Sequence, residues 1–344
     1  MARLGEATSL ESKRAISTLK TRWIKILETT HDASLQRPGF FRLWWIAARP
    51  YSLPASTMPL VFGTMLAVTI GGAPMHWFRF TAAFCGMVLL QVAANLVNDG
   101  VDYRRGFDRR VNPVSGAVVR GWITPGQAFV VGGALFVLGV VLLALLVMIV
   151  GLPILWIGLA GIAIGLLYSA GPFALKYHAV GDLAVFLDFG ILGALGAWTA
   201  QTGSPAWLPA VWAMPMSLLV IGILHANNWR DIEPDTAGGA RTIAALLGDR
   251  LSAVYYGFLL FSPFVLVLVL LAIGRLGIGP KMPLTFLLTW LAFPLAVRLV
   301  RRSLARHTNP GFAQFRALDG ATGQLNLVFG LLSIAALILA AIFP

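Results

Sequence analysis

Charged side chains are scarce in this sequence of 344 residues: Asp, Glu, Lys and Arg together make up 12% of it, whereas hydrophobic residues make up 58%. A soluble domain carries roughly twice that charged fraction, so a soluble globular class is excluded. Four windows contain no charged residue at all, namely 127–150, 152–175, 252–274 and 321–344. Each is long enough for a helix of ~20 residues, the length that crosses the hydrocarbon core of a bilayer.

Weaker apolar segments complete a set of nine expected transmembrane helices. They lie near 52–72, 80–98, 183–201, 207–228 and 283–297. In lipid only a helix or a closed barrel satisfies its own backbone, and these runs lack the alternation of barrel strands. The expected fold class is therefore all-α, a polytopic membrane protein built as one bundle of nine transmembrane helices.

Basic residues are almost missing from one side of this expected topology. With a cytoplasmic N-terminus, all 26 Lys and Arg residues lie inside except Arg79, Arg275 and Lys281. This positive-inside bias predicts an integral, multi-pass protein with a cytoplasmic N-terminus, in the plasma (inner) membrane if the source is bacterial. Because the bias accounts for the net charge of +12, no nucleic-acid partner is expected.

Cysteine is nearly absent as well. The single Cys85 excludes an intrachain disulfide and fits no metal-binding motif. It lies inside an expected helix, without a second cysteine for a disulfide or a set of ligands for a metal.

Residues 1–38 form a polar extension before the expected helical domain, residues 39–344. Apolar residues such as Ile16, Leu19 and Trp23 recur at helical spacing with basic residues between them. This pattern is typical of an amphipathic helix that lies on an anionic membrane surface. A weakly ordered soluble tail is the alternative.

Acidic residues outside this extension concentrate in two clusters, each at the end of a helix that runs from outside to inside. The first cluster contains Asn95, Asn98, Asp99, Asp102 and Asp108, and the second contains Asn227, Asn228, Asp231, Glu233 and Asp235. Both clusters are therefore expected at the cytoplasmic face.

Helical spacing aligns the oxygen-bearing side chains within each cluster. Asn95, Asn98 and Asp102 are three and four residues apart, so they share one helix face. The corresponding residues of the second cluster, 133 positions later, are Asn228, Asp231 and Asp235. The correspondence predicts an internal repeat whose two signature helices face each other.

Oxygen ligands without His or Cys suit a hard cation such as Mg²⁺, which takes one or two carboxylates and completes its shell with water and substrate phosphate. Arginines beside the acids could bind the remaining phosphate oxygens. They are Arg104, Arg105, Arg109, Arg110, Arg230 and Arg241. The alternative for each cluster alone is a set of solvated ion pairs and helix caps.

These residues resemble a known family. Asn98-Asp99-x-x-Asp102 with the later Asp108, and Asp231-x-x-x-Asp235, look like the two aspartate-rich motifs of the UbiA superfamily of intramembrane prenyltransferases. Further motifs resemble the branch that prenylates 1,4-dihydroxy-2-naphthoate for menaquinone and vitamin K. They are Ala48-Arg49-Pro50, Asn95-Leu-Val-Asn98, Gly106-x-Asp108, Tyr168-Ser169-x-Gly171-Pro172, Asn227-Asn228-x-Arg230-Asp231 and Arg241-Thr242. The resemblance covers about residues 40–344.

The resemblance implies a central cavity, open at the cytoplasmic face, that binds two Mg²⁺ ions bridged by an isoprenyl diphosphate. It implies metal ligation by Asn98, Asp99, Asp102, Asp108, Asp231 and Asp235, with catalytic roles for Asp102, Asp235 and Tyr168. It implies substrate contacts for Arg49, Asn95, Arg105, Ser169, Lys176, Asn227, Asn228, Arg230 and Arg241. The sequence departs from the family pattern at Ala240, where a basic residue is expected, and Asp108 is displaced by two residues relative to the ubiquinone-type motif.

The expected function is transfer of a polyprenyl chain to an aromatic acceptor, 1,4-dihydroxy-2-naphthoate, with loss of its carboxyl group. One alternative is a sister enzyme that acts on 4-hydroxybenzoate, homogentisate or a chlorophyll precursor. An alternative from another class is a secondary transporter, which would favour ionisable groups and broken helices at the membrane midplane. The prenyl chain length stays open.

Three features inside the expected helices have two interpretations each. Asp188 lies about two turns into the fifth span. It is either a functional acid within the membrane or simply an acid near the membrane interface. His225 precedes Asn228 by three residues. It either contacts the aromatic acceptor or is a hydrogen-bonded histidine of the helix packing. Gly161 and Gly165 predict close helix packing rather than chemistry.

Overall fold

The computed structural model describes residues 37–106, 116–169 and 174–343. The extension before residue 37 and the predicted site residue Asp108 lie outside this part of the chain, as do Gly171 and Pro172. The chain divides into two units, residues 1–44 and 45–344. The second unit contains the candidate site described below.

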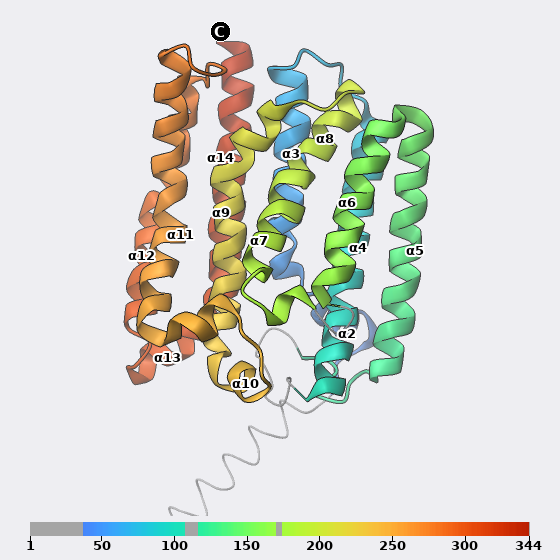
Figure 1. Ribbon diagram of the computed structural model, residues 1–344, viewed down its shortest axis with the longest axis vertical. Helices are drawn as coiled ribbons and strands as arrows, with labels where there is room; N and C mark the ends of the chain where they lie inside the picture. The colour runs from blue at the N-terminus through green and yellow to red at the C-terminus, as the bar shows by residue number, and fades with distance from the viewer. Residues whose placement is uncertain (1–36, 107–115, 170–173, 344) are drawn as a thin grey trace, which may run out of the picture. The chain divides into compact units, whose positions relative to one another are not determined.

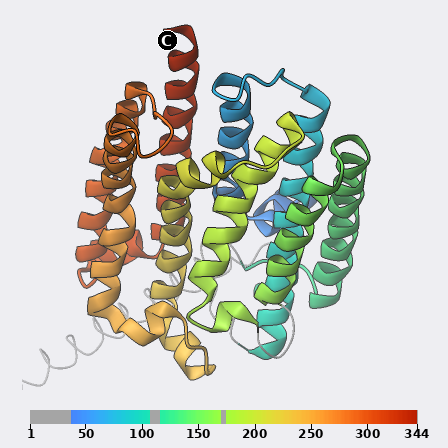
Figure 2. The same cartoon turned by 45° about the horizontal axis from the view of Figure 1, so that its top comes forward.

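Every regular element in the described residues is helical (Figures 1 and 2). After α2 (Phe40–Ala48) and η1 (Pro50–Ser52), the elements are α3 (Pro54–Thr69), α4 (Trp77–Arg105), α5 (Pro125–Val150), α6 (Leu152–Ser169), η2 (Leu175–Tyr177), α7 (Gly181–Val185), η3 (Phe186–Leu192), α8 (Gly193–Thr202), α9 (Trp207–Arg230), α10 (Ile232–Ala237), α11 (Ile243–Arg275), η4 (Leu284–Ala292), α12 (Phe293–Leu304), α13 (Asn309–Phe315) and α14 (Leu318–Ile342). The predicted all-α class is confirmed.

Eight helical segments of the described chain are long and apolar enough to cross a membrane. Two of them are composite: α7, η3 and α8 form Gly181–Thr202, and η4 with α12 forms Leu284–Leu304. The first predicted span corresponds to α3, which has only 16 residues. It yields a ninth span when it is counted together with the bent segment Phe40–Ser52 before it.

Two helix boundaries differ from the predicted spans. Helix α6 ends at Ser169, before the uncharged window 152–175 ends. Helix α11 begins at Ile243, well before the window 252–274, and contains a break at Gly248 (φ 68°, ψ 179°). The windows were bounded by charged residues, which mark where the membrane ends rather than where backbone hydrogen bonding ends.

Local capping fixes the end of α4 and the start of α5, which flank the first acidic cluster. Gly106 ends α4 with φ 77°, a conformation that glycine adopts without steric cost, and its N–H bonds to the carbonyls of Asp102 and Tyr103. Thr124 and Gln127 form a capping box at the start of α5, with bonds of 3.1 and 2.9 Å. The ends of these helices are therefore defined by the sequence itself.

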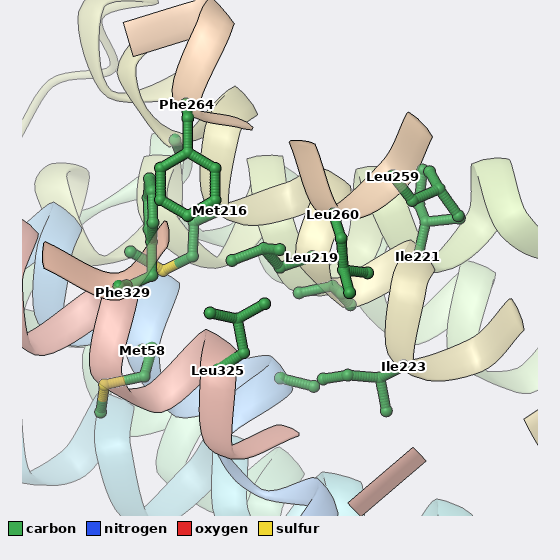
Figure 3. Packing of buried hydrophobic residues seen from close by; sticks show 14 of the residues in the cluster. Met58, Met216, Leu219, Ile221, Ile223, Leu259, Leu260, Phe264, Leu325 and Phe329 are labelled. Atoms are coloured by element: carbon green, nitrogen blue, oxygen red, sulfur yellow. The ribbon is translucent and has the colours of Figure 1, made fainter. Parts of the chain in front are cut away.

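The apolar core lies where α9, α11 and α14 pack together (Figure 3). Leu219, Leu260, Phe264 and Phe329 are each at most 2% exposed. The Phe264 and Phe329 rings meet edge to face at 5.6 Å, a favourable aromatic geometry. This core holds α9, which carries the second cluster, in a fixed position within the bundle.

Candidate functional site

The two predicted clusters lie at the same end of the bundle. Figure 1 shows the end of α4 and the short helix α10, which follows α9, at the end opposite the C-terminus. A single cavity of about 1190 Å³ is lined by both clusters. Along α4 its lining runs from Asp102 to Ala82, near the other end of that helix. The wall is polar around the clusters and mostly apolar farther along, where Asp188 is the exception with a carboxyl group.

Helix η2 supplies the partners of the first cluster. Lys176 Nζ lies 2.6 Å from Asp102 Oδ1, and the Tyr177 hydroxyl donates to the same oxygen at 2.5 Å. Lys176 also donates to Asn98 Oδ1, which accepts a second bond of 3.0 Å from Ser169 Oγ. Both donors to Asp102 use Oδ1, so Oδ2 accepts no hydrogen bond from the described residues and is available to a ligand.

Burial, followed by the negative charge of Asp102, raises the pKa of Tyr177 above its usual range. The phenol therefore stays protonated and remains a hydrogen-bond donor to the carboxylate. The Arg105 guanidinium lies 5.1 Å from the centre of the Tyr177 ring, and the Lys176 ammonium lies 4.7 Å from it. These contacts place two cations beside the Tyr177 ring, next to Asp102.

Arg230 organises the second cluster. Its guanidinium binds both carboxylate oxygens of Asp231, at 3.1 and 2.8 Å, and Asp319 of α14 at 2.9 Å. It also donates to the side-chain oxygen of Asn227. A bidentate bond of this kind fixes the geometry as well as the charge. The first turn of α14 is thereby joined to the end of α9.

Asp99 occupies a different position from its neighbours on α4. It is 1% exposed, it pairs with Arg49, and it is absent from the cavity lining. Asn95 donates to the carbonyl of Ala48 at 3.1 Å and to Ser52 Oγ at 3.3 Å. These bonds tie α4 to the segment before α3. The geometry favours a structural role for Asp99, while metal ligation by it stays a prediction.

The structure brings most of the predicted site residues to this one cavity. Those that line it are Arg49, Asn95, Asn98, Asp102, Arg105, Tyr168, Ser169, Lys176, Asn227, Asn228, Arg230, Asp231 and Asp235. Arg241 is not in the lining, and its backbone N–H bonds to the carbonyl of Tyr177 at 2.7 Å. Tyr168, at the end of α6, lines the same cavity as residues of both clusters.

The donor set fits magnesium better than a metal held by protein alone. Within the described ranges, no three His, Cys, Asp or Glu side chains converge as a metal centre. Mg²⁺ needs only one or two carboxylates when substrate phosphates complete its shell. Asn98 with Asp102, and Asp231 with Asp235, offer such oxygens from two sides of the cavity.

Sequence analysis missed two residues of this site. Tyr177 bonds directly to Asp102, but a tyrosine beside a membrane helix is usually an interfacial anchor, so its type gave no signal. Asp319 pairs with Arg230 across 89 positions of sequence. The available signal was its place at the start of an otherwise uncharged helix, since acids there are rare unless they have a partner.

The structure distinguishes between the two interpretations of His225. Its ring is fully buried, lies 3.2 Å from the Ser252 carbonyl, and packs edge to face against Tyr255 at 4.8 Å. It does not line the cavity, which supports the packing interpretation.

Gly161 and Gly165, for which the sequence predicts close helix packing, face the neighbouring segment η3. Both glycines also line the cavity, and the group of η3 that faces them is the Asp188 carboxylate.

The amino-acid sequence is similar to members of one protein family. The model of the UbiA prenyltransferase family matches residues 56–318. The chain is 32% identical to UbiA prenyltransferase domain-containing protein 1 of Danio rerio over 298 residues, which are 86% of this chain and 83% of that protein. It is 31% identical to the Drosophila melanogaster homolog over 300 residues, 86% of this chain and 79% of that one.

Two solved structures share the fold. A UbiA homolog from Aeropyrum pernix K1 superposes with a TM-score of 0.57 at 19% identity, covering 84% of this chain and 96% of that one. A UbiA homolog from Archaeoglobus fulgidus bound to GPP and Mg²⁺ gives 0.54 at 15% identity, covering 86% and 99%.

Proposed function

This chain belongs to the UbiA prenyltransferase family, and from that premise we propose that it transfers a polyprenyl chain from an isoprenyl diphosphate to 1,4-dihydroxy-2-naphthoate. The carboxyl group of the acceptor leaves as CO₂, which gives demethylmenaquinol. The observation that supports the proposal is one cavity with two oxygen-rich clusters at its polar end and apolar walls beyond them. A diphosphate and a hydrocarbon chain need these two environments in this order.

The polar end would bind the diphosphate. We propose that Asn98, Asp102, Asp231 and Asp235 would hold two magnesium ions, whose positive charge would stabilise the leaving diphosphate. Lys176, Arg105 and Arg230 would contact the remaining phosphate oxygens. Lys176 neutralises Asp102, so it would share its charge between this carboxylate and the diphosphate.

The proposed reaction depends on two features of the cavity: positive charge beside the diphosphate, and an apolar wall that excludes water from the reacting carbon. The allylic C–O bond breaks with its electron pair going to the diphosphate, and the apolar wall keeps water from the allylic cation. The Tyr168 ring, which lines the cavity, would stabilise the cation by its face. A ring carbon of the acceptor forms the new C–C bond, and the carboxylate on that carbon leaves as CO₂.

Within this family the choice of acceptor rests on the sequence motifs that resemble the naphthoate branch. A sister activity on 4-hydroxybenzoate is the second candidate, because the same cavity would accept a single ring. A transporter is disfavoured because the helix ends that carry the two clusters, on α4 and α10, lie at one end of the bundle rather than at its middle (Figure 1).

An assay of CO₂ release tests the proposal. Purified protein with Mg²⁺ and a prenyl diphosphate should release ¹⁴CO₂ from carboxyl-labelled 1,4-dihydroxy-2-naphthoate, and omission of the prenyl diphosphate should abolish the release. A parallel reaction with 4-hydroxybenzoate is the control. Turnover of 4-hydroxybenzoate alone would assign the chain to the sister activity instead.

A further inference from the structure

Asp188 is a carboxyl group inside the membrane-spanning bundle that the proposed mechanism does not use. It lies in η3, within the span Gly181–Thr202, and its side chain lines the cavity. Its carboxylate makes no hydrogen bond or ion pair with any described residue. A carboxyl group at such a depth is costly unless something bonds to it, and the polar groups of membrane spans usually mark a functional contact.

The position of the carboxylate is set by two glycines of α6. A Cβ atom built on Gly161 would lie 3.0 Å from Asp188 Oδ1, and one built on Gly165 would lie 3.9 Å from Oδ2. The carboxylate therefore lies at the level of these glycines. Helix α6 ends at Ser169, which bonds to Asn98, so the carboxylate lies roughly 6 to 12 Å beyond the polar clusters along the helix axis.

That depth corresponds to the place of an acceptor ring. The diphosphate would occupy the clusters, and the bond to be made is at its first allylic carbon, just inside them. The cavity wall around Asp188 is otherwise apolar, with Ile162, Phe189 and Leu192 in its lining. A hydrocarbon chain offers no hydrogen-bond donor to a carboxylate, whereas a phenolic hydroxyl does.

The backbone around Asp188 is irregular in a way that supports a site. Residues Phe186–Leu192 form a π-helical stretch, which is rare and occurs frequently at functional sites. The wider turn changes the direction in which residue 188 projects relative to a regular α-helix. We propose that Asp188 binds the aromatic acceptor by accepting a hydrogen bond from a ring hydroxyl, and thereby selects hydroxylated rings.

This inference rests on the proposed function for the identity of its ligand, and the chain supplies a matched control. Asp182 lies in the same span and is 4% exposed, but it accepts a bond of 3.2 Å from the Tyr255 hydroxyl and does not line the cavity. Asp182→Asn thus changes a buried carboxyl group of the same helix without touching the cavity.

The test measures equilibrium binding of two ligand pairs to the full-length protein in lipid nanodiscs. The pairs are 1,4-dihydroxy-2-naphthoate with its dimethyl ether, and 4-hydroxybenzoate with 4-methoxybenzoate. The wild type should prefer the hydroxylated member by about 10- to 100-fold, the scale of a hydrogen bond to a charged group. Asp188→Leu should remove the preference and change binding of geranyl diphosphate by less than about threefold, because a hydrocarbon chain makes no such bond.

Asp182→Asn should keep the wild-type preference. Gly161→Ala provides a second test that leaves Asp188 in place, because the added methyl group crowds Oδ1 and should reduce the preference. It also covers the case in which Asp188→Leu fails to fold.

Three outcomes would overturn the inference: a wild type that binds none of the four compounds, an Asp188→Leu protein that keeps the preference, or an equal loss of affinity for both members of a pair. The transfer assay separates this result from the proposed function. If the protein transfers prenyl groups but its preference for hydroxylated ligands does not depend on Asp188, this inference is wrong and the proposed function stands. If the preference for hydroxylated ligands depends on Asp188 but no prenyl group is transferred, the proposed function is wrong and the binding role of Asp188 stands.

Discussion

Asp102 accepts two hydrogen bonds on one of its oxygens, and this asymmetry leaves the other oxygen without a hydrogen bond from the described residues. Lys176 and Tyr177 both donate hydrogen bonds to Asp102 Oδ1. Asn98 Oδ1 accepts hydrogen bonds from Lys176 and Ser169. A buried lysine is stable only with a partner, and here the partner is the residue expected to hold the metal. Lys176 thus neutralises the carboxylate that is expected to hold the metal.

Removal of one charge from each cluster tests whether they form one site. Asp102→Asn and Asp235→Asn keep the shape of the side chain, and each should lower turnover by at least ~10², the scale of losing one electrostatic stabiliser of a leaving group. The double variant should lose much less than the product of the two, because residues that act as a unit are not additive. Steady-state kinetics at saturating Mg²⁺ give the three values.

Two controls accompany this measurement. Tyr177→Phe removes a hydrogen bond to Asp102 but no charge, so it should cost less than either Asp variant. Asp99→Asn, which is off the cavity lining, should also cost less. A fully multiplicative loss in the double variant would mean that the two clusters act separately.

At the scale of elements, the sequence was sufficient for the helices but not for the short segments between them. Apolar windows and the spacing of Asn and Asp placed α4 and α9 with their clusters, because both signals are local. Helix η2 and the start of α14 complete the site through Tyr177 and Asp319, and their positions depend on packing between distant segments. The π-helical η3 has no local signature, so the direction of Asp188 could not be predicted either.

The orientation of the bundle remains a prediction that labelling can test. In a Cys85→Ser background, cysteines placed at Arg105 and Gly238 should react with an impermeant maleimide only from the cytoplasmic side, because basic residues gather there. Ser204→Cys, in an exposed turn between α8 and α9, should react only from outside. The predicted topology is wrong if Arg105 or Gly238 reacts from outside.

At the scale of the whole molecule, the cavity extends far along the bundle. The α4 residues that line it run from Asp102 to Ala82, a stretch that spans roughly 30 Å along a helix. That length is close to the thickness of the hydrocarbon core of a bilayer. The bundle therefore encloses a path for a chain from its polar end almost to its opposite end.

This length has a consequence for affinity. If the acyl chain of a bilayer lipid fills this apolar space, an incoming prenyl tail exchanges one hydrocarbon for another. Lipid tails are as apolar as the leucines of the wall, so each added isoprene unit should change the dissociation constant by less than about tenfold. Transfer from water would give about a thousandfold for the same five carbons. Binding of a series of prenyl diphosphates to nanodisc-embedded protein measures this slope, and a steep slope would mean that the tail region is filled with water before the substrate enters.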